Sequence, residues 1–292
     1  MISLIKLLRP KHWIKNLFIF APPFFAGSLF HDFNIKLCVI VFTGFSLAAS
    51  SIYILNDIRD FKSDNLHPQK KNRPIACGLV KKSTGAVIAS ILAVFSIIIS
   101  YKAGKMFLYF VILYMLIQVA YSLFVKDMAI ADIFSIAAGF VIRVLAGGAA
   151  FHISPSRWLM LTMFLISVVL ATGKRLAEVN LLNSDVGSHR KSSLKYSKEL
   201  LNEFLIISSS SSMIAYSIYS IEQLSGLVYT VPVVMFGLFR YLMIAKLGLG
   251  DPTEALTKDK VLAATVILWL ILGGFIHYVD NHGGIISIIG NL

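Results

Sequence analysis

Three aspartates, Asp57, Asp60 and Asp64, lie close together in the chain. Their spacing of three and then four residues would place all three carboxylates on one face of a helix. Asn56, four residues before Asp60, falls on the same face. Crowded carboxylates repel one another, and Mg²⁺ relieves this by binding one or two of them together with phosphate oxygens of a substrate. These four residues therefore predict a Mg²⁺ site for a phosphate-bearing substrate. The alternative is a helix cap with a solvated acidic face.

Basic residues follow the aspartates within the same loop. The guanidinium of Arg73 can grip two phosphate oxygens at once. A metal ion combined with Lys or Arg is the usual way to stabilise a departing pyrophosphate. Lys70 and Lys71, taken singly, are better explained as cationic anchors at a membrane boundary. The loop thus extends the predicted metal site into a pyrophosphate site.

Two other places combine charge with an apolar setting. Lys174, Arg175 and Glu178 are spaced so that they can share a helix face. A plain membrane boundary would explain the two cations, whose long side chains reach water, but it does not require Glu178. Arg143 lies inside an apolar run, where a charge is costly enough to indicate function. The alternative for Arg143 is structural pairing with Asp132 or with backbone carbonyls.

The composition indicates what kind of protein must position these residues. Of its 292 residues, 57% are hydrophobic and 14% are charged. A soluble globular domain carries roughly 25% charged residues, so a water-soluble fold and a disordered chain are both excluded. Cys38 and Cys77 lack metal-ligand spacing. The net charge is +12, and the basic residues lie in short gaps between apolar runs. This pattern is typical of a membrane protein whose loops set its orientation, and it does not indicate a nucleic-acid partner.

Nine apolar runs approach the length of about 20 residues that a membrane-spanning helix needs. Pro22 and Pro23 interrupt the first run, and we expect a kinked helix there. The runs predict an all-α, polytopic membrane protein with one domain over residues 1–292. The predicted spans are 14–30, 35–56, 84–101, 106–124, 129–151, 157–179, 203–222, 226–247 and 260–279.

Lysine and arginine gather in the loops of one side. The loops of the opposite side hold only Lys36, Lys102, Lys105 and Arg157. The positive-inside rule therefore predicts a cytoplasmic N-terminus and, with nine spans, an external C-terminus. Most acidic residues lie in the basic loops, so we expect the active site at the cytoplasmic face.

The acidic cluster and the loop after it resemble the first aspartate-rich motif of the UbiA-type membrane prenyltransferase superfamily. The resemblance covers nearly the whole chain, from Leu8 to about Gly273. It implies a nine-transmembrane-helix bundle with a cytoplasmic cap over a central cavity. The motif reads Asn56-Asp57-x-x-Asp60-x-x-x-Asp64, followed by Arg73-Pro74-Ile75-Ala76-x-Gly78.

The chain departs from ordinary superfamily members at the end of the sixth span. Ordinary members carry a second aspartate-rich motif there, whereas this chain has two cations and one carboxylate. In this it resembles the phosphoribosyltransferase branch, which acts on decaprenyl phosphate. The motifs that carry this resemblance are Leu8-Arg9-Pro10-Lys11-His12-Trp13-Ile14-Lys15-Asn16, Tyr121-Ser122-x-x-x-Lys126, Gly139-x-x-x-Arg143 and Gly173-Lys174-Arg175-x-x-Glu178.

The branch implies Mg²⁺-dependent transfer of 5-phosphoribose from 5-phosphoribosyl pyrophosphate to a polyprenyl phosphate in a bacterial inner membrane. Because the attacking lipid phosphate is already an anion, the reaction needs positioning and charge neutralisation rather than a strong base. Segment 248–255 resembles a loop of this branch, although a plain turn explains it better than a ligand role. The implied residues are Asp57, Asp60, Lys174, Arg175 and Glu178 for catalysis, Asn56, Asp57, Asp60 and Asp64 for the metal, and Lys15, Asn56, Arg73, Tyr121, Lys126 and Arg143 for substrate.

Two other functions compete with this one. A prenyltransferase that joins an isoprenoid diphosphate to an aromatic acceptor would use the same first motif, but it predicts a second pair of aspartates. A transporter or lipid flippase would explain an arginine within the membrane, but not the acidic motif. The sequence gives neither the lipid chain length nor the oligomeric state.

Overall fold

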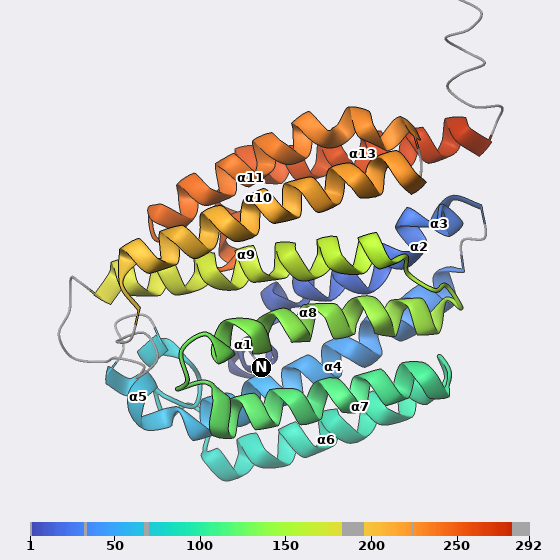
Figure 1. Cartoon of the computed structure of the whole chain (residues 1–292). Helices are drawn as coiled ribbons and strands as arrows, with labels where there is room; N and C mark the ends of the chain where they lie inside the picture. The colour runs from blue at the N-terminus through green and yellow to red at the C-terminus, as the bar shows by residue number, and fades with distance from the viewer. Residues whose placement is uncertain (1, 32–33, 67–69, 183–195, 224, 282–292) are drawn as a thin grey trace, which may run out of the picture.

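The structure, a computed structural model, describes residues 2–31, 34–66, 70–182, 196–223 and 225–281. Every regular element in these ranges is a helix, and no strand occurs in them (Figure 1). Eight helices in the described ranges are long and apolar enough to cross a membrane. The expected all-α, multi-pass membrane fold is therefore confirmed.

The long helices match the second to ninth predicted spans to within a few residues. They are α4 (Ile35–Arg59), α6 (Lys82–Tyr101), α7 (Lys105–Ala120), α8 (Ala131–Ala150), α9 (Arg157–Leu182), α10 (Lys198–Gln223), α11 (Val231–Lys246) and α13 (Lys260–Asn281). The shorter elements are α1 (Ile2–Leu8), η1 (Pro10–Phe20), α2 (Ala21–Phe25), α3 (Ser28–His31), α5 (Phe61–Leu66), η2 (Lys70–Asn72), η3 (Tyr121–Val125), η5 (Ser225–Thr230) and α12 (Pro252–Lys258).

The packing separates inner helices from outer ones. Helix α9 packs against both α8 and α10, while α4 packs on α6, and α7 on α8. Helices α6, α7, α11 and α13 bury less than a quarter of their apolar stretch, whereas α4, α8 and α9 bury more than half. The outer helices therefore present apolar side chains to the lipid, and the inner helices carry the polar residues discussed below.

The first predicted span, 14–30, differs from the single kinked helix that we expected. It forms the 3₁₀ helix η1 and then the short helices α2 and α3. Pro22 and Pro23, in the first turn of α2, lack the N–H groups that one continuous helix would need there. Gly27, at φ +73°, turns the chain between α2 and α3. The ninth membrane crossing therefore stays a prediction.

Helix η1 lies in the interior of the bundle, against α4 and α8. Its close approach to α8 requires Gly147, because a Cβ atom there would lie 1.8 Å from the carbonyl oxygen of Ile19. Ile19 is fully buried. This contact seats η1 among the inner helices and places its polar residues, including Lys15 and Asn16, inside the bundle.

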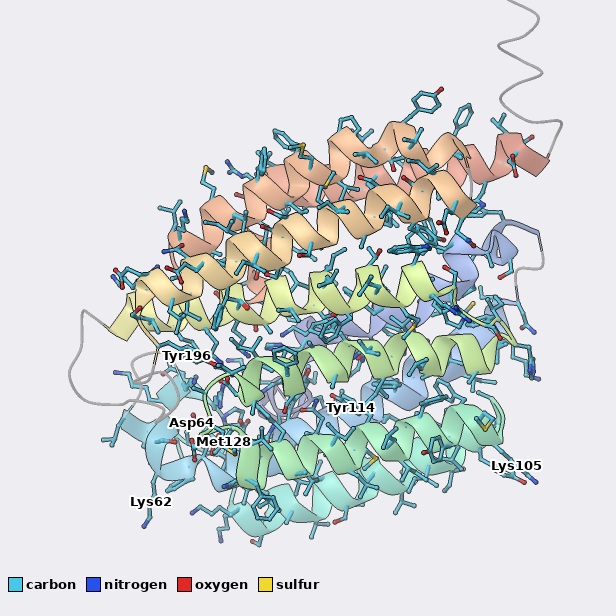
Figure 2. All side chains as sticks on the ribbon, in the orientation of Figure 1. Lys62, Asp64, Lys105, Tyr114, Met128 and Tyr196 are labelled. Atoms are coloured by element: carbon cyan, nitrogen blue, oxygen red, sulfur yellow. The ribbon has the colours of Figure 1, made fainter. Side chains whose placement is uncertain are left out.

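One end of the bundle, which we call the site end, gathers the charged residues. Helices α4, α9 and α11 end there, α8, α10 and α13 begin there, and α5 lies beside them (Figure 1). Figure 2 shows Asp64 and Tyr196 at this end and Lys105 at the opposite one. The positive-inside rule assigns the site end to the cytoplasm; this orientation and the cap over a central cavity stay predictions. The predicted external C-terminus lies outside the described residues.

Candidate active site

Asp57 is the most enclosed residue of the acidic motif. Its side chain is 1% exposed and accepts hydrogen bonds from Arg9 and, at 3.1 Å, from Arg73. Arg73 also donates to Asp64 at 2.6 Å. Arg73 therefore joins the first and third aspartates, as a cation close to the predicted metal site should. The sequence did not single out Arg9, which reaches Asp57 from the start of η1.

Asp60 is not part of the network of Asp57, Arg73 and Asp64. Helix α4 ends at Arg59, and Asp60 is the residue that caps its C-terminus. The three aspartates thus do not share one uninterrupted helix. The Asp60 carboxylate pairs with Lys126. Arg59 donates to the hydroxyl of Ser122 at 3.3 Å and to the carbonyl of Leu123 at 2.9 Å. These contacts tie the acidic motif to the π-helical turn η3, a type of turn that frequently occurs at functional sites.

The acidic motif offers oxygen donors suited to Mg²⁺. Among the described residues, no group of three or more His, Cys, Asp or Glu side chains forms a ready metal site. Mg²⁺, however, needs only one or two carboxylates when a substrate supplies phosphate oxygens. The Oδ2 atom of Asp57 is buried and has no hydrogen-bond partner in the described ranges. The side chain of Asp60 is 27% exposed. These residues, with Asn56 beside them on the last turn of α4, have the oxygen ligands for a divalent ion shared with a substrate.

Arg175 forms a second cluster near the end of α9. Its side chain is fully buried, and an oxygen lies near each of its three nitrogens, although Nε is not aligned for a hydrogen bond. Nε lies 2.6 Å from an oxygen of Asp132, Nη1 pairs with Glu178, and Nη2 donates to the Tyr121 hydroxyl at 3.0 Å. Of the group predicted on one helix face, Arg175 and Glu178 are therefore in contact, and Tyr121, predicted separately for substrate, joins them. The sequence had offered Asp132 as a partner of Arg143, and it pairs with Arg175 instead.

Lys15, Lys174 and Asp251 form a third cluster. One Asp251 oxygen accepts a hydrogen bond from Lys15 at 3.0 Å and lies 3.5 Å from the Lys174 ammonium. Its other oxygen caps α12 by accepting from the Thr253 N–H at 2.9 Å. Burial alone would raise the pKa of Asp251, but the charges of Lys15 and Lys174 outweigh it and hold this pKa well below its usual range. Asp251 lies in the segment that the sequence explained as a plain turn, so this contact is a finding of the structure.

His12 lies beside this third cluster. Its ring centroid is 5.5 Å from that of Tyr53. Burial, and then the nearby charge of Lys15, lower the pKa of His12 to about 3. His12 is therefore neutral near pH 7 and can serve as a hydrogen-bonding group beside the two lysines.

Arg143 is buried in the interior and is bonded to protein groups. Its nitrogens donate to Asn16 Oδ1 at 2.9 Å, to the Gly139 carbonyl at 2.7 Å and to the Tyr114 hydroxyl at 3.0 Å. Its guanidinium carbon also lies 4.7 Å from the centre of the Tyr114 ring. The carbonyl pairing is part of the structural alternative foreseen from the sequence. The phosphate-binding role predicted for Arg143 stays untested.

Two short elements connect the three clusters. Helix η1 supplies Lys15 to Asp251, and the residue just before η1, Arg9, pairs with Asp57. Turn η3 carries Tyr121, and Lys126 follows it directly. Cations and carboxylates are therefore interleaved at one end of the bundle. Such an arrangement can bind a polyanion and neutralise charge on a leaving group without a strong base.

Sequence comparison identifies the group of proteins that this chain resembles. The profile of the UbiA prenyltransferase family matches residues 17–259. The chain is 35% identical to a decaprenyl-phosphate phosphoribosyltransferase of Mycolicibacterium smegmatis, over 94% of this chain and 93% of that protein. It is 31% identical to the Mycobacterium tuberculosis protein of the same name, over 93% of each chain.

Structure comparison agrees on the fold. A UbiA homologue from Archaeoglobus fulgidus, solved with GPP and Mg²⁺, superposes with a TM-score of 0.71 over 95% of this chain and 100% of that one. The two sequences are 15% identical, so this likeness concerns the arrangement of helices alone.

Proposed function

The chain belongs to the UbiA prenyltransferase family of membrane enzymes, and on this premise we propose that it transfers 5-phosphoribose from 5-phosphoribosyl pyrophosphate to a polyprenyl phosphate. The products are a polyprenyl-phosphoryl-5-phosphoribose and pyrophosphate. The names of the relatives that match over nearly their whole length support this reaction class.

The observation that carries the proposal is the presence of two separate groups of cations. Arg9, Arg73 and Lys126 surround the acidic motif, while Lys15 and Lys174 meet at Asp251. The proposed donor has a pyrophosphate on one side of the ribose and a 5-phosphate on the other. A prenyl diphosphate would place an apolar tail where the second phosphate lies. Two cationic groups therefore favour the phosphoribosyl donor.

We assign the pyrophosphate to the acidic motif and the cations around it. Asn56, Asp57, Asp60 and Asp64 would hold Mg²⁺, which when bound neutralises charge on the pyrophosphate. Arg9, Arg73 and Lys126 now pair with these carboxylates and would contact phosphate oxygens in the complex.

We assign a second phosphate of the reactants, the 5-phosphate, to Lys15 and Lys174, with neutral His12 as a hydrogen-bonding neighbour. Glu178 and Tyr121, which are half-buried, would contact the ribose. Direct phosphate contact by Arg143 and Arg175 would require the exchange of their present protein partners. Their contacts favour a role in shaping the site.

The transfer itself needs little from the protein besides position and charge. An oxygen of the lipid phosphate attacks the anomeric carbon of the ribose, a new C–O bond forms, and the bond to pyrophosphate breaks. Because the nucleophile is an anion, no residue has to remove a proton from it. Cations near the departing pyrophosphate stabilise the charge that it gains. The lipid acceptor would enter from the membrane with its phosphate at the site end.

A direct assay tests the proposal. The purified protein is incubated with radiolabelled 5-phosphoribosyl pyrophosphate, a polyprenyl phosphate and Mg²⁺, and the lipids are extracted and counted. We expect label in the lipid phase only when the polyprenyl phosphate is present. A parallel reaction contains a prenyl diphosphate and an aromatic acid. Turnover in this second reaction alone would replace our proposal with aromatic prenylation.

A further inference from the structure

Arg175 is the most deeply buried cation of the site end. Its side chain is 0% exposed, and so is that of Asp132, its partner at 2.6 Å. Its other two partners are less enclosed. The side chain of Glu178 is 25% exposed, and Tyr121 is half-buried. The guanidinium therefore connects a buried carboxylate on one side to two groups nearer the surface on the other.

Asp132 is held in turn by Tyr196, which lies just before α10. The Tyr196 hydroxyl donates to Asp132 at 2.7 Å and accepts the backbone N–H of Ile130 at 2.5 Å. Ile130 has a φ of +68°, which is strained for a β-branched residue. The hydrogen bond to Tyr196 helps to keep this conformation, because such strain persists only where surrounding contacts enforce it. Tyr196 thus fixes both the start of α8 and the carboxylate of Asp132.

These contacts form a continuous series from the buried Tyr196 and Asp132 through Arg175 to the less enclosed Glu178. We propose that Tyr196 and Asp132 are positioning residues for the transfer reaction, which fix the Arg175 guanidinium so that it holds Glu178 in place for the ribose. The proposal rests on the proposed function, because it takes the ribose as the group that Glu178 meets. Tyr196 and Asp132 touch neither substrate and act only through Arg175.

The effect of these contacts is to keep the Glu178 carboxylate in one position. A glutamate side chain has several rotatable bonds, and a flexible carboxylate would lose entropy each time it ordered on a substrate. A guanidinium that is itself locked at two other nitrogens keeps the carboxylate in one place before substrate arrives. Displacement of a catalytic group by about 1 Å can cost roughly a hundredfold in rate. A loss of positioning should therefore lower kcat more than it raises KM.

Removal of the Tyr196 hydroxyl tests this series of contacts with little change in packing. We expect Tyr196→Phe to lower kcat roughly tenfold, with KM for 5-phosphoribosyl pyrophosphate changed by no more than about twofold. Tyr216→Phe is the matched control, because Tyr216 is also buried and its hydroxyl also makes two hydrogen bonds, with Thr230 at 2.6 Å and Trp269 at 2.9 Å. Those contacts lie away from Arg175, so the control should keep kcat within about twofold of the wild type.

A double-mutant cycle separates positioning from a general structural role. In a Glu178→Gln background, Tyr196→Phe should lower kcat by no more than about twofold, because the group that it positions has already been changed. Tyr216→Phe should have the same small effect in both backgrounds. If Tyr196→Phe still costs about tenfold in the Glu178→Gln protein, its effect does not pass through Glu178, and the proposal is wrong.

The remaining outcomes are also decisive. If Tyr196→Phe does not give a folded protein in size-exclusion chromatography, Asp132→Asn enters the same cycle with the same expectation. Equal kcat values for Tyr196→Phe and Tyr216→Phe would overturn the positioning role while leaving the proposed function intact. If the wild type transfers no label from 5-phosphoribosyl pyrophosphate to lipid, the proposed function fails and this inference fails with it.

Discussion

Replacement of Lys174 by methionine should weaken the binding of the phosphoribosyl donor without unfolding the protein. The Lys174 ammonium lies 3.5 Å from the Asp251 carboxylate, and Lys15 lies 3.0 Å from the same oxygen. Asp251 therefore keeps one cation after the substitution. Methionine preserves most of the apolar stem that Lys174 contributes to packing. The substitution should therefore weaken mainly the contact with the bound phosphate.

The size of the effect follows from burial. Loss of one partner from a buried charge pair costs about 2–5 kcal/mol. Here the Lys174 side chain is 33% exposed, and a second lysine remains, so solvent and Lys15 both reduce the cost. We expect about 1–2 kcal/mol, which corresponds to an increase of roughly 5-fold to 30-fold in the donor KM. The KM for the polyprenyl phosphate should change by less than about threefold.

The assay measures initial rates of label transfer into extracted lipid at varied donor and then at varied acceptor concentration. Lys246→Met is the matched control, because Lys246 is an exposed lysine at the end of α11, at the same end of the bundle. It should leave both KM values unchanged. An unchanged donor KM in Lys174→Met, or a larger change in the acceptor KM, would refute the assignment of Lys174 to a donor phosphate.

Three other predictions concern metal, pH and topology. EDTA should abolish transfer, and added Mg²⁺ should restore it. Asp57→Asn should raise the Mg²⁺ concentration needed for half-maximal turnover. Activity that survives EDTA would show that the reaction does not require a metal ion. Burial, and then Lys15, lower the pKa of His12 to about 3, so below pH 6.5 the unfolded chain takes up a proton that the folded protein does not. The Tm in detergent should therefore fall as the pH drops from 6.5 toward 3, and His12→Gln should flatten this dependence; an equal slope in both proteins would show that His12 is not the cause. A reporter fused after Lys82 should lie in the cytoplasm, and one fused after Lys102 should lie outside, because Lys and Arg gather in the loops of one side. The reverse result would show that the site end faces outward.

The long α-helices could be predicted from the sequence because each is a local property of the chain. An apolar run of about 20 residues has few alternatives to a membrane helix, since backbone groups in lipid must bond within their own segment. The same reasoning was less successful for residues 14–30. Those residues are apolar enough to resemble a span, but Pro22 and Pro23 at the start of α2 and the turn at Gly27 divide them among three short helices. Proline removes backbone donors that hydropathy does not count.

The acidic motif was also visible in the sequence as three closely spaced aspartates, although α4 ends at Arg59 and it is Arg73 that joins Asp57 to Asp64. The sequence could not indicate which cation each carboxylate would meet. Asp57 is paired with Arg9 and with Arg73, whereas the sequence had assigned Arg73 to a phosphate. Arg9 comes from the N-terminal segment, and its position depends on how η1 packs between α4 and α8.

The chain by itself therefore determined the kind of protein, the membrane helices and the place of the acidic motif, since these depend on residue type and short spacing. Tertiary structure alone decided the pairing of charges that are far apart in the sequence. Lys15 and Asp251 are 236 residues apart in sequence yet lie in contact, and Asp132 pairs with Arg175 rather than with Arg143. An unpaired charge in the interior costs far more than a paired one. Each charge therefore pairs with whichever opposite charge the packing of the helices brings within reach, and that packing has no local signature in the sequence.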